Sequence, residues 1–229
     1  MGSHHRILCI ETSTRNCSVA LFEGELCLFS LEEAPMALVH SDRLHPMIEA
    51  VLQTASCSYP ELQAVAVGMG PGSYTGLRIG LSAAKGLCFA LGIPLLPLSS
   101  LEIVLHSQFE EERKQNREPA AFYHPMIDAR RMEVYTAGFD ALGHRWSADR
   151  PMILDQEQPA PVGRCFGDGS AKAREILTPL GFEVLDGPLP SARSAGRLIQ
   201  KAWNEKAFAH LATADPEYLK EFRSGNPAT

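Results

Sequence analysis

The sequence predicts an α/β protein built of two lobes. In both halves of the 229-residue chain, short apolar segments typical of strands alternate with apolar residues at helical spacing. A polar, charge-rich stretch at 107–119 separates the halves and marks a lobe boundary. We therefore expect a first lobe over residues 6–106 and a second over 107–229, whose last segment is a candidate to pack back on the first lobe. Residues 1–5 look like a remnant of cloning and carry no expectation.

Three strands in a meander are expected to open the first lobe. Residues 7–11 are apolar and a polar turn follows them. The apolar segments 17–22 and 26–31 flank Glu23-Gly24-Glu25, which predicts a hairpin turn in which glycine supplies the positive φ. The first sheet is thus expected to start at the beginning of the chain.

Helices and further strands complete this lobe. Apolar residues at helical spacing predict a helix over 41–52, with Pro46 in or near its first turn. The run 64–68 predicts a buried strand, and a glycine-rich loop leads from it into a helix over 75–91 that Gly92 ends. The remaining elements are a strand at 95–98 and a helix from Ser99 or Ser100 to about His106.

The second lobe repeats the mixture of strands and helices. Strands are expected at 121–127, 132–139 and 162–167, and Ser170 and Ser191 are candidate helix caps. The last long helix presents an apolar face made of Leu198, Ile199, Ala202 and Trp203.

Charge and cysteine content limit the classes of function. The chain has 21 Lys and Arg against 27 Asp and Glu, a formal net charge of −6, so strong unaided binding to nucleic acid is not expected. The six cysteines show no CxxC spacing and read as reduced thiols. Uncharged runs are too short for a spanning helix of ~20 apolar residues, so we expect a cytoplasmic protein without membrane contact.

The stretch from Gly70 to Gly80 is the most informative part of the sequence. Glycines between a buried strand and a helix allow backbone N–H groups to face an anion, but a tight structural turn explains them equally well. The helix behind the loop carries a ridge of small residues at Gly76, Gly80 and Ala84. Either this chain's own sheet or a partner helix packs closely against that ridge.

Several motifs together resemble the TsaB (YeaZ) family. They are Ile10-Glu11-Thr12-Ser13-Thr14, the loop from Gly70 to Gly80 with Ala84-Lys85-Gly86, Ser99-Ser100-Leu101-Glu102, Asp128-Ala129-Arg130-Arg131-Met132-Glu133-Val134-Tyr135, Gly167-Asp168-Gly169 and Pro216-Glu217-Tyr218-Leu219. The resemblance implies an actin-like, Hsp70-like (ASKHA) two-lobe fold. It also implies a part in making threonylcarbamoyladenosine in tRNA, as a non-catalytic relative of the transferase TsaD.

The same resemblance implies that this chain has no catalytic residue, metal or cofactor of its own. TsaD carries a metal-ligating His-x-Glu-Gly-His segment, and the corresponding register here reads Ser100-Leu101-Glu102-Ile103-Val104. Both imidazoles are replaced, and serine and valine are not substitute ligands. The other histidines occur without metal-ligand spacing, and no Gly-x-Ser-x-Gly motif indicates a hydrolase.

TsaD is the partner that the resemblance implies, in a heterodimer that TsaE joins and that brings this chain to tRNA. The first two helices of the first lobe would then pack against equivalent helices of TsaD, and the same surface could form a homodimer when the chain is alone. The residues expected at this contact are Leu44, Ile48, Val51, Leu52, Gly76, Gly80 and Ala84.

A stand-alone actin-like ATPase or phosphotransferase is the alternative. Its phosphate contacts would be Glu11, Ser13, Gly72 and Ser73. Glu11 stands where the ATPases of this superfamily usually have an aspartate and a glycine-containing turn, which makes nucleotide turnover the less favoured hypothesis.

Overall fold

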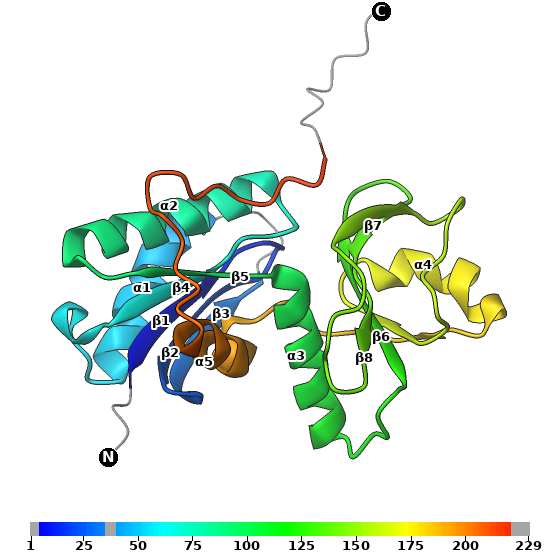
Figure 1. Cartoon of the computed structure of the whole chain (residues 1–229), viewed down its shortest axis with the longest axis horizontal. Coiled ribbons are helices and arrows are strands. Elements are labelled where there is room, and N and C mark those ends of the chain that lie inside the picture. Colours follow the sequence, from blue (N-terminus) through cyan, green and yellow to red (C-terminus); the bar gives the residue numbers. More distant parts are fainter. Residues whose placement is uncertain (1–4, 35–39, 221–229) are drawn as a thin grey trace, which may run out of the picture.

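A computed structural model describes residues 5–34 and 40–220. The two lobes lie side by side with α3 (Ser100–Lys114) between them (Figure 1), and each lobe is built on a mixed sheet. The first sheet has the strand order β3-β2-β1-β4-β5, and the second has the order β11-β10-β6-β7-β9, with β8 paired to β6. This arrangement confirms the predicted α/β class.

The first sheet contains the predicted meander. β1 (Arg6–Glu11) pairs antiparallel with β2 (Cys17–Glu23), which pairs antiparallel with β3 (Leu26–Glu33). On its other side β1 runs parallel to β4 (Ala64–Gly68), which runs parallel to β5 (Leu95–Leu98). β1 and β4 are nearly fully buried because elements cover both faces of the sheet.

The helices α1 (His40–Thr54) and α2 (Tyr74–Leu91) cover one face of this sheet, and the short helix η1 (Tyr59–Glu61) follows α1. Leu8 and Ile10 point from β1 into this core. Their neighbours Ile7 and Cys9 point to the opposite face, which η3 (Ala192–Ala195) and α5 (Gly196–Asn204) cover. The two faces of the first sheet are therefore covered by elements from distant parts of the sequence.

Helix α3 contributes to the cores of both lobes. Ile103 packs in the first lobe, whereas Leu101, Val104 and Leu105 pack in the second. The predicted end at His106 is wrong, since the helix continues to Lys114. The charged stretch extends the helix because Glu112 turns inward, where its carboxylate accepts hydrogen bonds from Arg164 at 2.7 Å and from the Tyr123 hydroxyl at 2.8 Å.

The second sheet shows both the predicted strands and unpredicted ones. β6 (Phe122–Asp128), β10 (Arg164–Phe166) and the helix α4 (Ser170–Leu177) agree with expectation, and η2 (Thr178–Leu180) follows α4. The expected strand 132–139 is divided into β7 (Glu133–Thr136), which pairs with residues 126–128 of β6, and β8 (Phe139–Asp140), which pairs with residues 122–123 of β6. β9 (Arg150–Ile153) and β11 (Glu183–Val184) were not predicted.

The segment after α5 returns along the first lobe and reaches the second (Figure 1). Ala209 bridges to Leu95, and Lys85 donates to the Ala214 carbonyl at 3.1 Å. Farther on, Lys220 pairs with Glu133 of β7 and donates to the Ala129 carbonyl at 3.2 Å. Within residues 5–34 and 40–220, no helix has both the length and the apolar character needed to span a membrane.

Candidate functional site

A cleft of about 410 Å³ lies between the lobes. Ser73 shapes its first-lobe wall, since its hydroxyl caps α2 by accepting from Gly76 N and its own N–H donates to the Ser13 carbonyl at 2.6 Å. Gly72 is required here because a Cβ would lie 2.3 Å from the Ser13 carbonyl oxygen. The cleft is lined by residues 13–15, 72–74, 127–130, Tyr135, Asp168 and 217–220.

Glu11 does not line this cleft, although it was grouped with Ser13, Gly72 and Ser73 as a phosphate contact. Its side chain is 0% exposed, and its two carboxylate oxygens accept hydrogen bonds from Ser13 N at 2.6 Å and from the Ser100 hydroxyl at 2.9 Å. Burial raises the pKa of Glu11, and these hydrogen bonds oppose that rise. Glu11 therefore links the β1–β2 turn to the start of α3. Its carboxylate is engaged in these contacts, which argues against the phosphate-binding role that the ATPase alternative assigns to it.

The second-lobe wall of the cleft depends on Asp168. Its carboxylate accepts from Asp128 N at 3.0 Å, and burial raises the pKa of Asp168. Arg130 and Arg131 occupy the β6–β7 turn with φ values of 66° and 47°, and only Arg130 faces the cleft. The glycine-flanked position of Asp168 in the sequence suggested a turn and gave no sign that this carboxylate faces the other lobe.

The register that corresponds to the TsaD metal segment is occupied by structural contacts. Ser100 donates to Glu11, Glu102 pairs with Arg145 at 3.3 Å, and Val104 is fully buried. In the part of the chain that the structure describes, no group of three or more His, Cys, Asp or Glu side chains is arranged to hold a metal ion.

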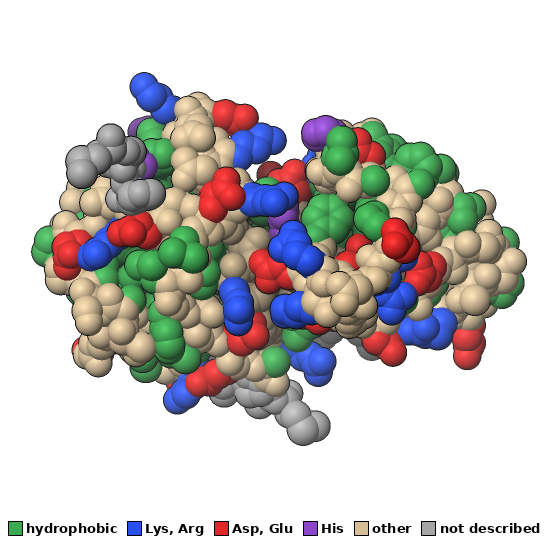
Figure 2. Space-filling view, turned by 90° about the horizontal axis from the view of Figure 1, so that it is seen from below, with side chains coloured by type: hydrophobic (Ala, Val, Ile, Leu, Met, Phe, Trp, Pro, Cys, Tyr) green, Lys and Arg blue, Asp and Glu red, His purple; other side chains and the backbone are tan. Residues whose placement is uncertain are grey.

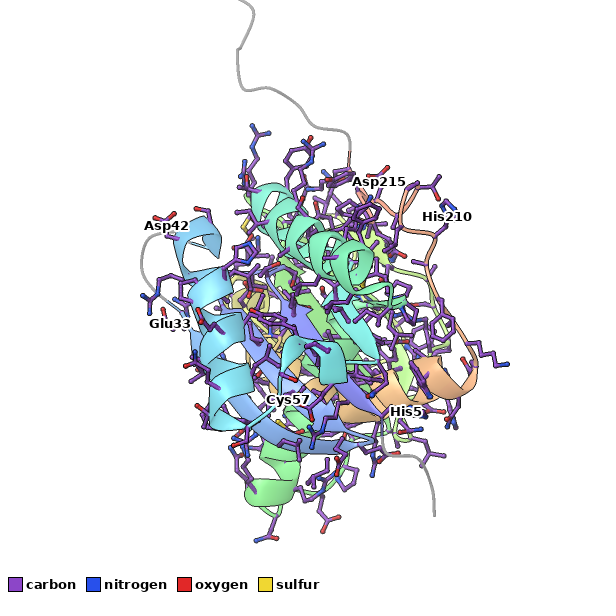
Figure 3. The ribbon with its side chains drawn as sticks, turned by 90° about the vertical axis from the view of Figure 1, so that its left-hand side faces the viewer. His5, Glu33, Asp42, Cys57, His210 and Asp215 are labelled. Carbon is purple, nitrogen blue, oxygen red and sulfur yellow. The ribbon has the colours of Figure 1, made fainter. Side chains whose placement is uncertain are left out.

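A second hollow, a groove of about 520 Å³, lies between α1 and α2. Figure 3 views the molecule from the side of these helices, with Asp42 at the start of α1. Ser82, Ala83 and Gly86 are the small residues of this groove, and a Cβ added at Gly86 would meet no atom within 4 Å. Phe89, about one turn farther along α2, is 85% exposed. The groove is lined by Ser41, His45, Arg78, Ile79, Ser82, Ala83, Gly86 and Leu87.

The seven residues expected at the partner contact do not form this surface. Leu44, Ile48, Val51 and Leu52 of α1 are at most 3% exposed and pack on the first sheet. The ridge of Gly76, Gly80 and Ala84 is also buried: a Cβ at Gly80 would lie 2.3 Å from Thr12 Oγ1, and Ala84 is 0% exposed. The close neighbour of the ridge is thus the chain's own β1 and the turn after it. The seven residues are therefore part of the chain's own core, and the groove lies on the exposed side of the same two helices.

Arg78 lies between the groove and the cleft. Its guanidinium carbon is 4.0 Å from the Tyr74 ring centroid, and its Nε donates to the Tyr218 hydroxyl at 2.9 Å. Both tyrosines line the cleft, while Arg78 itself lines the groove. Sequence reasoning missed this contact because 140 residues separate Arg78 from Tyr218.

Comparisons with known proteins agree with this geometry. The family model described as "TsaD: tRNA N6-adenosine threonylcarbamoyltransferase" matches residues 36–156. The chain is 37% identical to the tRNA threonylcarbamoyladenosine biosynthesis protein TsaB of Escherichia coli, over 94% of each chain. It is 33% identical to the protein of the same name in Bacillus subtilis, over 93% of each chain.

A solved structure gives the same result for the fold. YeaZ from Pseudomonas aeruginosa superposes with a TM-score of 0.78 at 28% identity, covering 94% of this chain and 100% of that chain. This likeness and the two mixed sheets confirm the predicted actin-like (ASKHA) fold. With relatives at this identity along nearly its whole length, the chain belongs to the TsaB (YeaZ) family of tRNA threonylcarbamoyladenosine biosynthesis proteins.

Proposed function

We propose that this chain is a non-catalytic subunit that binds a TsaD-type transferase and supports threonylcarbamoyl transfer to the adenosine beside the anticodon of tRNA. Family membership supports a part in threonylcarbamoyladenosine biosynthesis, because the relatives that match nearly the whole chain carry that name. The occupied positions of Glu11, Ser100 and Val104 favour an accessory role over independent catalysis.

The groove between α1 and α2 is the observation that carries the partner contact. Ser82 and Gly86 leave space for a close helix approach, while Ile79, Leu87 and Phe89 supply apolar contact area beside them. A helix or helix pair of the partner fits such a surface because small residues let two helix axes come close. The family model that matches residues 36–156 covers both helices, which suggests that the partner presents an equivalent pair.

Gly86→Leu tests the partner contact at an exposed position of α2, where no atom lies within 4 Å of an added Cβ. We expect this variant to lose capture by immobilised TsaD and to lose support of tRNA modification in a reconstituted reaction. The matched control is Ala171→Leu, which places the same side chain at an exposed position of α4 in the other lobe. Unchanged capture and modification by Gly86→Leu would rule out the groove as the contact.

Reconstitution with and without the chain tests the function itself. Equal modification of tRNA by TsaD, TsaE and threonylcarbamoyl adenylate in the absence of this chain would contradict an accessory role. The predicted contact with TsaE and the predicted homodimer in isolation stay predictions, and analytical ultracentrifugation of the chain alone tests the latter.

A further inference from the structure

A basic groove lies on the face of the first sheet opposite to α1 and α2. It has a volume of about 510 Å³ and runs between the C-terminal part of α3, the start of β3, and the η3–α5 segment. η3 and α5 pack closely against the β2–β3 turn, since a Cβ at Gly196 would lie 2.5 Å from the Glu25 carbonyl oxygen. The groove is lined by Glu25, Leu26, Cys27, His106, Phe109, Glu110, Arg113, Lys114, Arg193, Ser194, Gly196 and Arg197.

The cations of this groove form a line. Arg193 and Arg197 line the groove, and Lys201 lies one turn of α5 beyond Arg197, outside the lining. All three side chains are exposed, whereas Ala195 and Ile199 between them are buried. At 1.5 Å of rise per residue, Arg197 and Lys201 of α5 are about 6 Å apart along the helix axis. Arg113 and Lys114 at the end of α3 face Arg193 and Arg197 across the groove.

These positive charges are largely uncompensated. Across the described residues, the side chains of Arg113, Arg193, Arg197 and Lys201 make neither an ion pair nor a hydrogen bond. Lys114 in the same groove is paired with Glu111 at 2.6 Å, and many other Lys and Arg side chains, such as Arg150 and Arg174, are also paired. Figure 2, which shows the molecule from below, has Lys and Arg side chains gathered near the middle of the face, with some Asp and Glu among them. Of the acidic side chains, Glu25 and Glu110 line the groove itself.

The histidine in the wall of the groove adds no charge at neutral pH. Burial, with a smaller contribution from Arg197, lowers the pKa of His106 to about 4. The electrostatic character of the groove therefore comes from Arg and Lys side chains, which keep their charge across the physiological range.

From this arrangement we infer that the basic groove binds the sugar-phosphate backbone of RNA. A nucleic-acid strand carries a phosphate every few ångströms, and a line of unpaired cations matches that repeat. Arg forks suit phosphate oxygens, and backbone contacts need no apolar anchor. The inference rests on the proposed function, in which the RNA is the tRNA that the complex modifies.

An acidic protein segment is the competing occupant, and the groove favours it less. Protein interfaces are centred on buried apolar or aromatic anchors. Of the residues lining the groove, Leu26 is the one large apolar side chain that is mostly exposed, at 65%, so the groove offers a single anchor. Phe109 is already packed edge-on against Tyr123, with their ring centroids 5.0 Å apart. An interface made mainly of exposed cations is typical of nucleic-acid backbone contacts.

Bound RNA in this groove and a partner on α1 and α2 do not compete for space. The two surfaces lie over opposite faces of the first sheet, with the Leu8–Ile10 core on one side and the Ile7–Cys9 core on the other. α2 and α5 accordingly lie on opposite sides of the sheet in Figure 1.

A charge-neutral triple variant, Arg193→Gln, Arg197→Gln and Lys201→Gln, tests the inference. We expect its affinity for fluorescently labelled unmodified tRNA at low salt, measured by anisotropy, to fall at least about tenfold, and the slope of log affinity against log salt to fall by about 2 to 3. A control of equal formal charge removes three cations from the surface of the second lobe by Arg131→Gln, Arg150→Gln and Arg174→Gln, of which Arg150 and Arg174 are ion-paired with Glu157 and Asp186. The control is expected to keep the wild-type slope, because its cations lie outside the groove.

The measurement is made on the chain alone and on the chain bound to TsaD, with TsaD capture and urea unfolding recorded for each variant. Wild-type tRNA affinity in the triple variant, an equal loss in the control, or no difference between variants in either setting would overturn the inference. Displacement of the tRNA by poly-glutamate that binds the groove as tightly would overturn it in favour of an acidic protein segment. A loss of tRNA affinity in the triple variant with intact TsaD capture supports RNA binding by the groove. Failed capture of the wild type by TsaD would count against the proposed function, and the inference would then be decided by the tRNA affinities of the chain alone.

Discussion

Two glycines of α2, six residues apart, give the sharpest test of how the first lobe is packed. Gly86 is exposed, and a Cβ there would meet no atom within 4 Å. Gly86→Ala therefore adds no contact to the folded state and removes conformational freedom from the unfolded chain. Glycine in a helix interior is less favourable than alanine by roughly 0.5–1 kcal/mol. We expect Gly86→Ala to raise the free energy of unfolding by that amount.

Gly80→Ala is expected to act in the opposite direction. The added Cβ would lie 2.3 Å from Thr12 Oγ1, which donates to the Gly76 carbonyl at 2.8 Å. Relieving that clash by moving the strand turn or the helix costs about 1–3 kcal/mol, and loss of the buried hydrogen bond costs about 1 kcal/mol more. The gain in helix propensity offsets up to about 1 kcal/mol of this. The net result is a loss of about 1–3 kcal/mol.

Urea unfolding followed by circular dichroism measures both variants against the wild type. The structure predicts that the free energies of unfolding of Gly86→Ala and Gly80→Ala differ by about 1.5–4 kcal/mol, with unchanged m-values. Equal stabilisation by both substitutions would refute the reasoning, because it would mean that the small-residue ridge does not pack against Thr12. In that case the ridge would again be available to a partner helix.

Three further substitutions test other parts of the structure. Arg164→Met leaves the buried Glu112 carboxylate without its ion pair, and we expect urea unfolding to show a loss of about 3–5 kcal/mol. His106 has its folded pKa lowered to about 4 from the ordinary 6.5, so the unfolded chain binds a proton that the folded chain does not, and stability falls as the pH drops through this window. His106→Gln should remove that part of the pH dependence, at most about 3 kcal/mol between pH 7 and 4, and a variant that titrates like the wild type would contradict the assignment. Ser100→Ala deprives the buried Glu11 carboxylate of one donor, for an expected loss of about 1–3 kcal/mol in the same assay, and no change would argue against the contact.

Strong periodicity made most of the first lobe predictable. The strands and helices with clear apolar spacing, from β1 to β5, agree with expectation to within a few residues. β8 and β11 are two residues long, which is too short for a period to be recognised, and the four residues of β9 lack the continuous apolar character of β5 because they include Arg150. The full length of α3 could not be predicted because its charged second half looks like a loop in the sequence. Glu112 in that half turns inward and pairs with Arg164 of a distant strand.

The candidate sites were predictable only in part, for a physical reason. Ser13, Gly72 and Ser73 meet because the turns after β1 and β4, two neighbouring parallel strands, lie at one edge of the sheet. The residues expected at the partner contact are buried in the core instead, because an apolar helical stripe such as Leu44 and Ile48 has the same pattern whether it faces the chain's own sheet or another protein. By strand alternation, Glu11 lies on the same face of β1 as Ile7 and Cys9, where its carboxylate meets Ser100 at the start of α3 and does not line the cleft.

The net charge of −6 describes the whole chain, but binding depends on where the charges lie. Many cations of this protein are held in ion pairs such as Arg164 with Glu112, so they contribute little to the field outside. The unpaired cations of η3 and α5 instead lie together on the face that α1 and α2 leave open. This acidic chain therefore carries a groove lined mainly by small and apolar residues on one side of the first sheet, and a group of exposed cations on the other side. Because the first sheet separates these faces, a substitution that abolishes one interaction should leave the other intact.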